Sequence, residues 1–161
     1  MDIKQALGVM LKQNEGAVKK LWDNISDEES LERGSENLTH IRWIAGHITN
    51  ALGYMVNIAG GTSHIPTGWD ELFRGGKEME EDFSKYPLMD EIRANFDLNR
   101  KELYKALENI PTEELETAKE IAPDWNIPPQ EALMFLVNHE FYHAGQISTM
   151  RNILGKERAF G

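Results

Sequence analysis

The chain has 161 residues, 40% of them hydrophobic, with no cysteine and a formal net charge of −10 at pH 7. This length and apolar content predict one domain, residues 1–161, and the acidic balance argues against nucleic acid or an anionic membrane surface as partner. The lack of cysteine excludes disulfides, thiolate zinc sites and catalytic thiols, so His, Asp and Glu remain as strong metal ligands.

The sequence carries no signal for a membrane span or a leader. No apolar run approaches the roughly 18 to 20 residues that a span needs. The first residues, "MDIKQALGVMLKQ", alternate charged and apolar side chains, unlike a basic leader followed by an apolar stretch. We therefore expect a cytoplasmic location and no membrane partner.

Two helices are predicted in the first 59 residues. Apolar residues recur at helical spacing from Ile3 to Trp22. The acidic segment that follows, "DNISDEESLERGSENL", is predicted to be a solvated connection or a short exposed helical turn. A second helix is predicted from a cap at Asn37 or Thr39 to about Ala59, where "GGTS" ends it.

Residues 60–86 are predicted to be a long connection. They contain two glycine pairs, Pro66 and Trp69, and show little sustained periodicity. A connection of this length in a compact domain is usually a crossover or a functional flap. Within it, "GWDELFRGG" is predicted to form a short helix or a lid.

The remaining residues predict two more helices and few strands. Apolar spacing from Leu88 to Ile110 marks a third helix, and three prolines in "IAPDWNIPP" end what precedes them. A fourth helix begins near Pro129 and stops at Gly155. Because strand signals are nearly absent, the predicted fold class is all-α: a four-helix bundle with a long crossover between helices two and three.

The stretch "HEFYHAGQ" contains the H-E-x-x-H spacing of zinc proteases. His139 and His143 are four residues apart, so on a helix their rings project from one face. A zinc protease would use Glu140 as its base and a ligand further downstream, but no histidine follows His143 and no sheet is evident. The candidate third ligand is His47, in the middle of the second helix, which bundle packing could bring against the fourth.

Three neutral imidazoles, from His47, His139 and His143, would leave coordination positions open to water or substrate, as catalytic metal sites do. The alternative for the fourth-helix pair is a hydrogen-bonded packing role at a helix interface. His40 lies two turns before His47, about 10.5 Å away along the helix, and is not expected to share an ion. His64 is predicted to be an exposed loop residue.

Other polar residues near the stripe have open roles. Glu140 points about 100° away from its neighbour His139, which predicts a salt-bridged surface residue rather than a proton carrier. Asn50 and Asn99 are candidates to orient ligand imidazoles. Gln146 could line the open position or bond across helices. For each, satisfaction of a core polar group is the alternative.

At these residues the chain resembles the DinB/YfiT-like family of metal-dependent four-helix-bundle proteins. The stretches "LTHIRWIAGHI" and "NHEFYHAGQISTMRNILG" resemble its two signatures. In that resemblance Trp43 is the aromatic one turn before His47, and His139 and His143 begin the second signature, followed by Gly145 and Gln146. The likeness extends over nearly the whole chain in helix order and length, whereas residues 60–86 match no subfamily.

The resemblance implies a four-helix bundle, often a homodimer, with a divalent zinc or nickel ion at its histidines. Characterised relatives are mostly S-transferases or isomerases that use low-molecular-weight thiols such as bacillithiol or mycothiol. The residues predict the metal site, and the resemblance implies a metal-dependent enzyme that activates an external thiol for attack on a small-molecule substrate under Trp69–Gly76. The alternatives are a metal-dependent hydrolase and a non-catalytic metal-binding or structural helical dimer.

Overall fold

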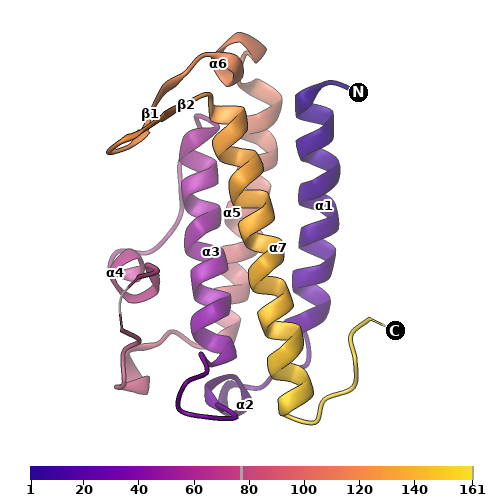
Figure 1. The fold of residues 1–161 in the computed structure, drawn as a ribbon, viewed down its shortest axis with the longest axis vertical. Coiled ribbons are helices and arrows are strands. Elements are labelled where there is room, and N and C mark those ends of the chain that lie inside the picture. The colour runs from indigo at the N-terminus through magenta and orange to yellow at the C-terminus, as the bar shows by residue number, and fades with distance from the viewer. Residues whose placement is uncertain (77, 161) are drawn as a thin grey trace.

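The computed structural model describes residues 1–76 and 78–160. Four long helices run side by side (Figure 1): α1 (Ile3–Trp22), α3 (Ile41–Ile58), α5 (Met89–Asn109) and α7 (Pro129–Ile153). The shorter elements are α2 (Asp27–Leu31), α4 (Trp69–Phe73), a 3-10 turn (Phe83–Lys85), α6 (Thr112–Glu116), β1 (Lys119–Ala122) and β2 (Trp125–Ile127). Helices dominate, so the predicted all-α class is confirmed.

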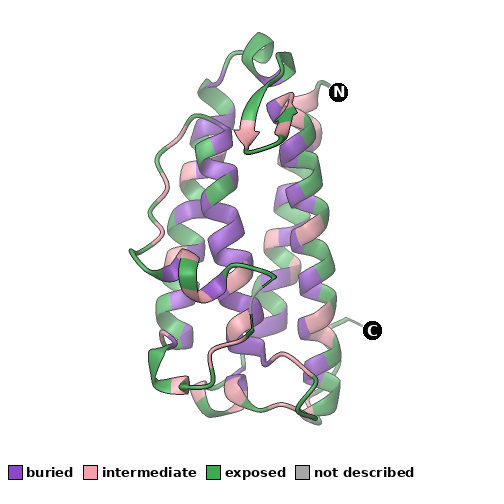
Figure 2. Cartoon of the chain, turned by 60° about the vertical axis from the view of Figure 1, so that its left-hand side comes forward, coloured by how far each residue is buried: buried purple, intermediate pink, exposed green. Residues whose placement is uncertain are grey.

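The long helices bury their apolar stripes against one another. Helix α3 packs against both α5 and α7, and α7 also packs against α1. Each long helix contributes side chains that are at most 1% exposed: Leu11, Ile48, Phe96 and Ile147. Figure 2 shows the buried residues concentrated along these helices. Burial of one such side chain contributes about 1.5–3 kcal/mol, so this packing holds the helices that carry the histidines.

The predicted ends of the first and last long helices agree with the structure. Helix α1 spans the predicted residues, and Asp2 caps it through a capping box with Gln5. Helix α7 begins at the predicted Pro129 and ends at Ile153, two residues before Gly155, whose φ of 71° suits a residue without a side chain. Between α1 and α3, the acidic segment contains α2, one of the two predicted possibilities.

Helix α3 begins differently from the prediction. Its N-cap is His40, not Asn37 or Thr39, and Nδ1 of His40 accepts a hydrogen bond of 3.0 Å from the backbone N–H of Trp43. The ring is fully buried, with the edges of Phe83 and Tyr86 packed against it. The sequence pattern could not reveal this cap, because the residues that bury it arrive from the other end of the 60–86 connection.

The buried His40 makes stability depend on pH. Burial, assisted by the charges of Arg33 and Arg42, lowers the pKa of His40 from 6.5 to about 4. Unfolding therefore takes up a proton between these values, and the free energy of unfolding falls as pH drops from about 6.5 to about 4, by up to about 2–3 kcal/mol. We expect His40→Asn, a good cap that does not titrate, to lack this component in urea unfolding curves. Parallel pH profiles for both proteins would contradict it.

Residues 60–76 follow the outer side of α3 (Figure 1). The predicted short helix in "GWDELFRGG" is confirmed as α4. Trp69 and Phe73 of α4 are buried and their rings meet edge to face, at a centroid distance of 5.3 Å. Burial of this aromatic pair stabilises the packing of α4 against α3.

A short hairpin precedes α7, where the sequence predicted no strand. Strands β1 and β2 are antiparallel, with Lys119 opposite Ile127 and Glu120 opposite Asn126. Asp124 turns the chain with a φ of 64°, a conformation that Asp tolerates better than most residues. The hairpin is too short for an alternating pattern to show in the sequence. Within the described residues, no helix has the length and apolar character needed to cross a bilayer.

Candidate metal centre

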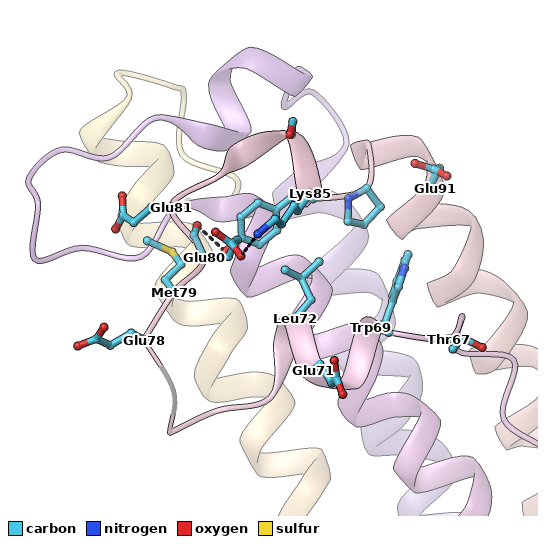
Figure 3. A pocket seen from close by; sticks show the side chains of 14 residues that line it. Thr67, Trp69, Glu71, Leu72, Glu78, Met79, Glu80, Glu81, Lys85 and Glu91 are labelled. Atoms are coloured by element: carbon cyan, nitrogen blue, oxygen red, sulfur yellow. Dashed lines mark hydrogen bonds and ion pairs between the residues drawn. The ribbon is translucent and has the colours of Figure 1, made fainter.

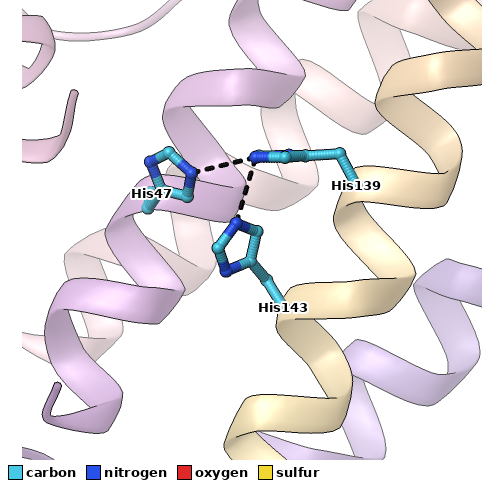
Figure 4. Close-up of side chains that lie close together, drawn as sticks. All are labelled: His47, His139 and His143. Atoms are coloured by element: carbon cyan, nitrogen blue, oxygen red, sulfur yellow. Dashed lines mark hydrogen bonds between the residues drawn. The ribbon is translucent and has the colours of Figure 1, made fainter. Parts of the chain in front are cut away.

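Three histidines from two packed helices, α3 and α7, face one another (Figure 4). Nε2 of His139 lies 3.2 Å from Nε2 of His47 and 3.0 Å from Nε2 of His143. The three ligand atoms all lie within 4.8 Å of one another. The structure thus brings together the three histidines that the sequence predicted as ligands.

Hydrogen bonds to the far side of two rings define where their protons are. Nδ1 of His47 lies 2.6 Å from the carbonyl oxygen of Phe73, and Nδ1 of His143 lies 2.6 Å from Oε1 of Gln146. Both oxygens accept only, so each Nδ1 donates and each Nε2 presents a lone pair to the cluster. His139 can donate an Nε2 proton to only one of the other two Nε2 atoms. Its contact with the remaining Nε2 is then repulsive, and a cation between the nitrogens would remove that repulsion.

The spacing of the nitrogens fits a metal ion. With metal–nitrogen bonds of about 2.0–2.1 Å, two ligand nitrogens lie about 3.3 Å apart in a tetrahedral site and about 2.9 Å apart in an octahedral one. Two of the three distances, 3.0 and 3.2 Å, lie within this interval, and the third pair lies within 4.8 Å. The cluster could therefore hold one divalent ion.

Burial favours the neutral form of all three imidazoles, which is the form that a metal ligand needs. Burial lowers the pKa of His47 and of His139, and it lowers the pKa of His143 to about 4. The neighbouring histidines lower the pKa of His139 and His143 further, whereas the carbonyl of Phe73 acts in the opposite direction on His47. The lowered pKa values weaken the competition of protons with a metal ion for the three nitrogens.

Helix α4 positions His47 through a close approach to α3. Gly46 has no side chain, and a β-carbon there would overlap the ring of Phe73. This contact places the carbonyl of Phe73 at Nδ1 of His47. Trp43 stacks on the other side of that imidazole, with centroids 4.8 Å apart and planes 10° apart, as a packing residue should. Phe73 was missed by sequence reasoning, and Gly46 in an otherwise apolar helix was its only signal.

Comparison with known proteins places the chain in a family. The profile of the DinB superfamily matches residues 10–147. The chain belongs to the DinB superfamily. Among solved structures, a conserved protein from Enterococcus faecalis is similar with a TM-score of 0.72 and 15% identity, over 97% of this chain and 99% of that chain. At this identity the likeness concerns the fold alone. No curated protein matches the chain.

In this DinB-superfamily chain, the amides predicted to orient imidazoles bind elsewhere. Nδ2 of Asn50 lies 3.3 Å from Oδ1 of Asp70, and the same carboxylate accepts hydrogen bonds from the hydroxyl of Tyr54 and from Arg74. Asp70 thereby ties α4 to α3. Asn99 accepts a bond of 2.9 Å from the backbone N–H of His64, so it secures the 60–86 connection. Both assignments to the histidines were wrong.

Gln146 and His64 have simpler roles. Gln146 and His143 both lie on α7, and the side chain of Gln146 binds Nδ1 of His143 and so orients this ring. The same side chain contacts the hydroxyl of Tyr142, at 3.4 Å, and Gln146 thus bonds within α7 and not across helices. His64 is exposed, as predicted. Nδ1 of His139 is buried and has no hydrogen-bond partner among the described residues. Of the three rings, His139 is therefore the one whose Nδ1 is not held by a hydrogen bond to a described residue.

Glu140 is not the exposed residue that its position predicted. Its side chain is 4% exposed and forms an ion pair with Arg100 of α5, which is 1% exposed. Nδ2 of Asn14 on α1 donates to Oε2 of Glu140 at 3.1 Å and to the carbonyl of Val137 at 2.8 Å. The carboxylate therefore lies in the core, on the α1–α5 side of α7. The base that a zinc protease would take from H-E-x-x-H is not available here.

A large hollow lies beside α4, and none of the three histidines is among the residues that line it (Figure 3). It encloses about 1050 Å³ between α4 and residues 78–91. Its charged lining is mostly acidic: Glu71, Glu78, Glu80, Glu81, Glu91 and Lys85. Lys85 binds Glu80 at 2.7 Å. We refer to this hollow as the acidic recess.

Proposed function

We propose that His47, His139 and His143 bind one divalent ion, zinc or nickel, through Nε2, and that the chain is a metal-dependent S-transferase acting on an external low-molecular-weight thiol. The observation that carries the proposal is the convergence of three Nε2 atoms, two of them with Nδ1 protons held by fixed acceptors. Membership in a metal-binding superfamily supports it. The scaffold in this proposal is a four-helix bundle whose crossover, residues 60–86, carries α4.

The residues around the cluster suit an open metal centre. A divalent ion on three neutral imidazoles lowers the pKa of a thiol or water at its open position. The chain itself provides three Nε2 lone pairs, and Phe73 and Gln146 prevent two of the rings from turning. Because the chain has no cysteine, the thiol has to come from solution.

One observation favours thiol activation over hydrolysis. The candidate proton carrier Glu140 is buried in an ion pair with Arg100 and is not free to serve a water molecule at the cluster. A thiol deprotonates more readily than water and needs no such base. Hydrolysis and a purely structural role are the alternatives that turnover measurements decide.

The first test of this function is thiol turnover. We expect the zinc- or nickel-loaded protein to accelerate the reaction of at least one low-molecular-weight thiol with a panel of reactive electrophiles. His143→Ala removes a ligand and should return the rate to that measured without protein, whereas His64→Ala, a loop histidine outside the cluster, should leave it unchanged. No acceleration by the metal-loaded protein, or equal rates for both variants, would overturn the proposal.

We also propose that the chain forms a homodimer through the outer face of α7. Phe141 and Tyr142 are 62% and 63% exposed, and Phe135 and Met134 lie on the same helix with more than 40% exposed. A second copy could cover these side chains in an isologous contact. Light scattering that gives a monomer mass, unchanged by Phe141→Ser, would contradict this proposal.

A further inference from the structure

A second hollow lies along α3 and α7 on the side where the hairpin folds over them. It encloses about 730 Å³, a volume usual for small-molecule pockets. We name it the hairpin pocket. It is lined by residues of α3, α7 and the hairpin, and by the residue that follows α4: Tyr54, Asn57, Ile58, Leu136, Lys119, Glu120, Ile121, Ala122, Pro123, Trp125 and Arg74.

The hairpin pocket has an apolar interior. Ile58 of α3 and Leu136 of α7 are 8% and 9% exposed and contribute buried side chains to its lining. Ile121 and Trp125 of the hairpin are half-buried and pack against the core. These four side chains come from three elements and offer a surface for the apolar body of a ligand.

The charges at the hairpin pocket favour an anion. Arg74 and Lys119 line it, and Glu120 is the one carboxylate in its lining. Its lining thus carries one more cationic than anionic side chain, on a chain whose net charge is −10. Asp70, outside the lining, offsets part of the charge of Arg74. Arg74 uses one Nη to bind Asp70, and the guanidinium has further N–H donors. The acidic recess has the opposite sign and would repel the same ligand.

The hairpin pocket lies near the histidine cluster, although none of the three histidines lines it. Leu136 precedes His139 by three residues, about 4.5 Å along the helix axis. The ring of Trp125 meets that of Phe135 at 5.7 Å, and Phe135 in turn lies 6.2 Å from the ring of His139. Arg74, which also lines the pocket, directly follows Phe73, whose carbonyl binds His47. The pocket is therefore next to residues that contact the cluster.

We infer that the hairpin pocket binds a small organic acid with an apolar body, whose carboxylate interacts with Arg74 and Lys119. Arg and Lys attract carboxylates, and an arginine fork can bind one through two parallel hydrogen bonds. The role of this acid as the substrate of the cluster rests on the proposed function, whereas its binding does not. The inference names the substrate class: an apolar carboxylic acid rather than a cation or a neutral polar molecule.

The test uses 4-phenylbutanoate and its neutral isostere 4-phenylbutanamide as probes. Both are titrated into the full chain, as purified and after addition of zinc, and followed by amide chemical shifts and tryptophan fluorescence. We expect the carboxylate to bind about 5- to 10-fold more tightly than the amide, with shifts centred on Ile58, residues 119–125 and Leu136. Lys119→Gln should remove most of this preference and Arg74→Gln should reduce it. Lys12→Gln, an exposed lysine on α1, is the matched control and should change nothing.

Two results would overturn the inference: equal binding of the two probes, or shifts that centre on the acidic recess. Arg74 also contacts Asp70, so Lys119→Gln is the variant that decides the charge effect without disturbing α4. Probe binding to a protein that takes up no metal would support the pocket and reject the proposed function. Metal binding without a carboxylate preference would reject the pocket alone.

Discussion

Glu140→Leu is expected to lower the free energy of unfolding by about 3–5 kcal/mol, the cost of leaving a buried charge without its partner. Arg100 would remain 1% exposed in the core, over the ring of Phe96. Its Nε and Nη1 have no hydrogen-bond partner among the described residues, so the ion pair with Glu140 is its main compensation. Burial raises the pKa of Glu140, and Arg100 and Asn14 oppose this.

The control for this prediction is the double variant Arg100→Leu/Glu140→Leu. Replacement of both charges by apolar side chains is often neutral or stabilising, so the double variant should recover most of the loss. Urea unfolding followed by circular dichroism, with chelator present to remove metal linkage, measures all three proteins. A loss below about 1 kcal/mol for Glu140→Leu, or a double variant as unstable as the single one, would contradict the role of the pair.

Gly46→Ala is expected to weaken zinc binding about 10- to 100-fold, the usual effect of disturbing a group that orients a metal ligand. The added methyl overlaps the ring of Phe73, so α4 has to shift and its carbonyl leaves Nδ1 of His47. Helix propensity alone would favour Ala over Gly by about 1 kcal/mol. Lower metal affinity without a matching loss of helix content is therefore the distinctive result.

Gly145→Ala is the matched control for Gly46→Ala. Gly145 lies on α7, two residues after His143, and a β-carbon there would meet nothing within 4 Å. Its zinc affinity, measured by competition with a chromophoric chelator, should equal that of the wild type. If Gly46→Ala also bound zinc like the wild type, Phe73 would have no part in holding His47.

The sequence could predict features that depend on one helix at a time. Apolar spacing placed α1, and Pro129 marked the start of α7. The i, i+4 spacing of His139 and His143 put both rings on one face. The expectation that His47 meets them also followed from a position on one stripe. Each of these histidines is spaced at the helical period from the apolar residues of its own helix. The sequence alone therefore indicates which face of the helix it occupies.

The features that were missed depend on contacts between distant segments. Glu140 sits one residue from the histidine stripe, and its burial is explained by Arg100 and Asn14, which lie 40 and 126 residues earlier in the chain. Phe73 comes from a stretch without periodicity, and its backbone carbonyl, which any residue carries, makes the contact with His47. The capping by His40 requires the aromatic residues that cover it. None of these partners is marked by a local pattern.

The metal content of the protein tests the central claim most directly. Inductively coupled plasma mass spectrometry on untagged, undialysed protein is compared with His47→Ala and His139→Ala, each checked for intact helicity. We expect about one equivalent of zinc or nickel in the wild type and its loss in both variants, since each removes one of three ligands. Wild-type protein that holds no metal even after incubation with zinc or nickel, or variants that retain a full equivalent, would contradict the three-histidine centre.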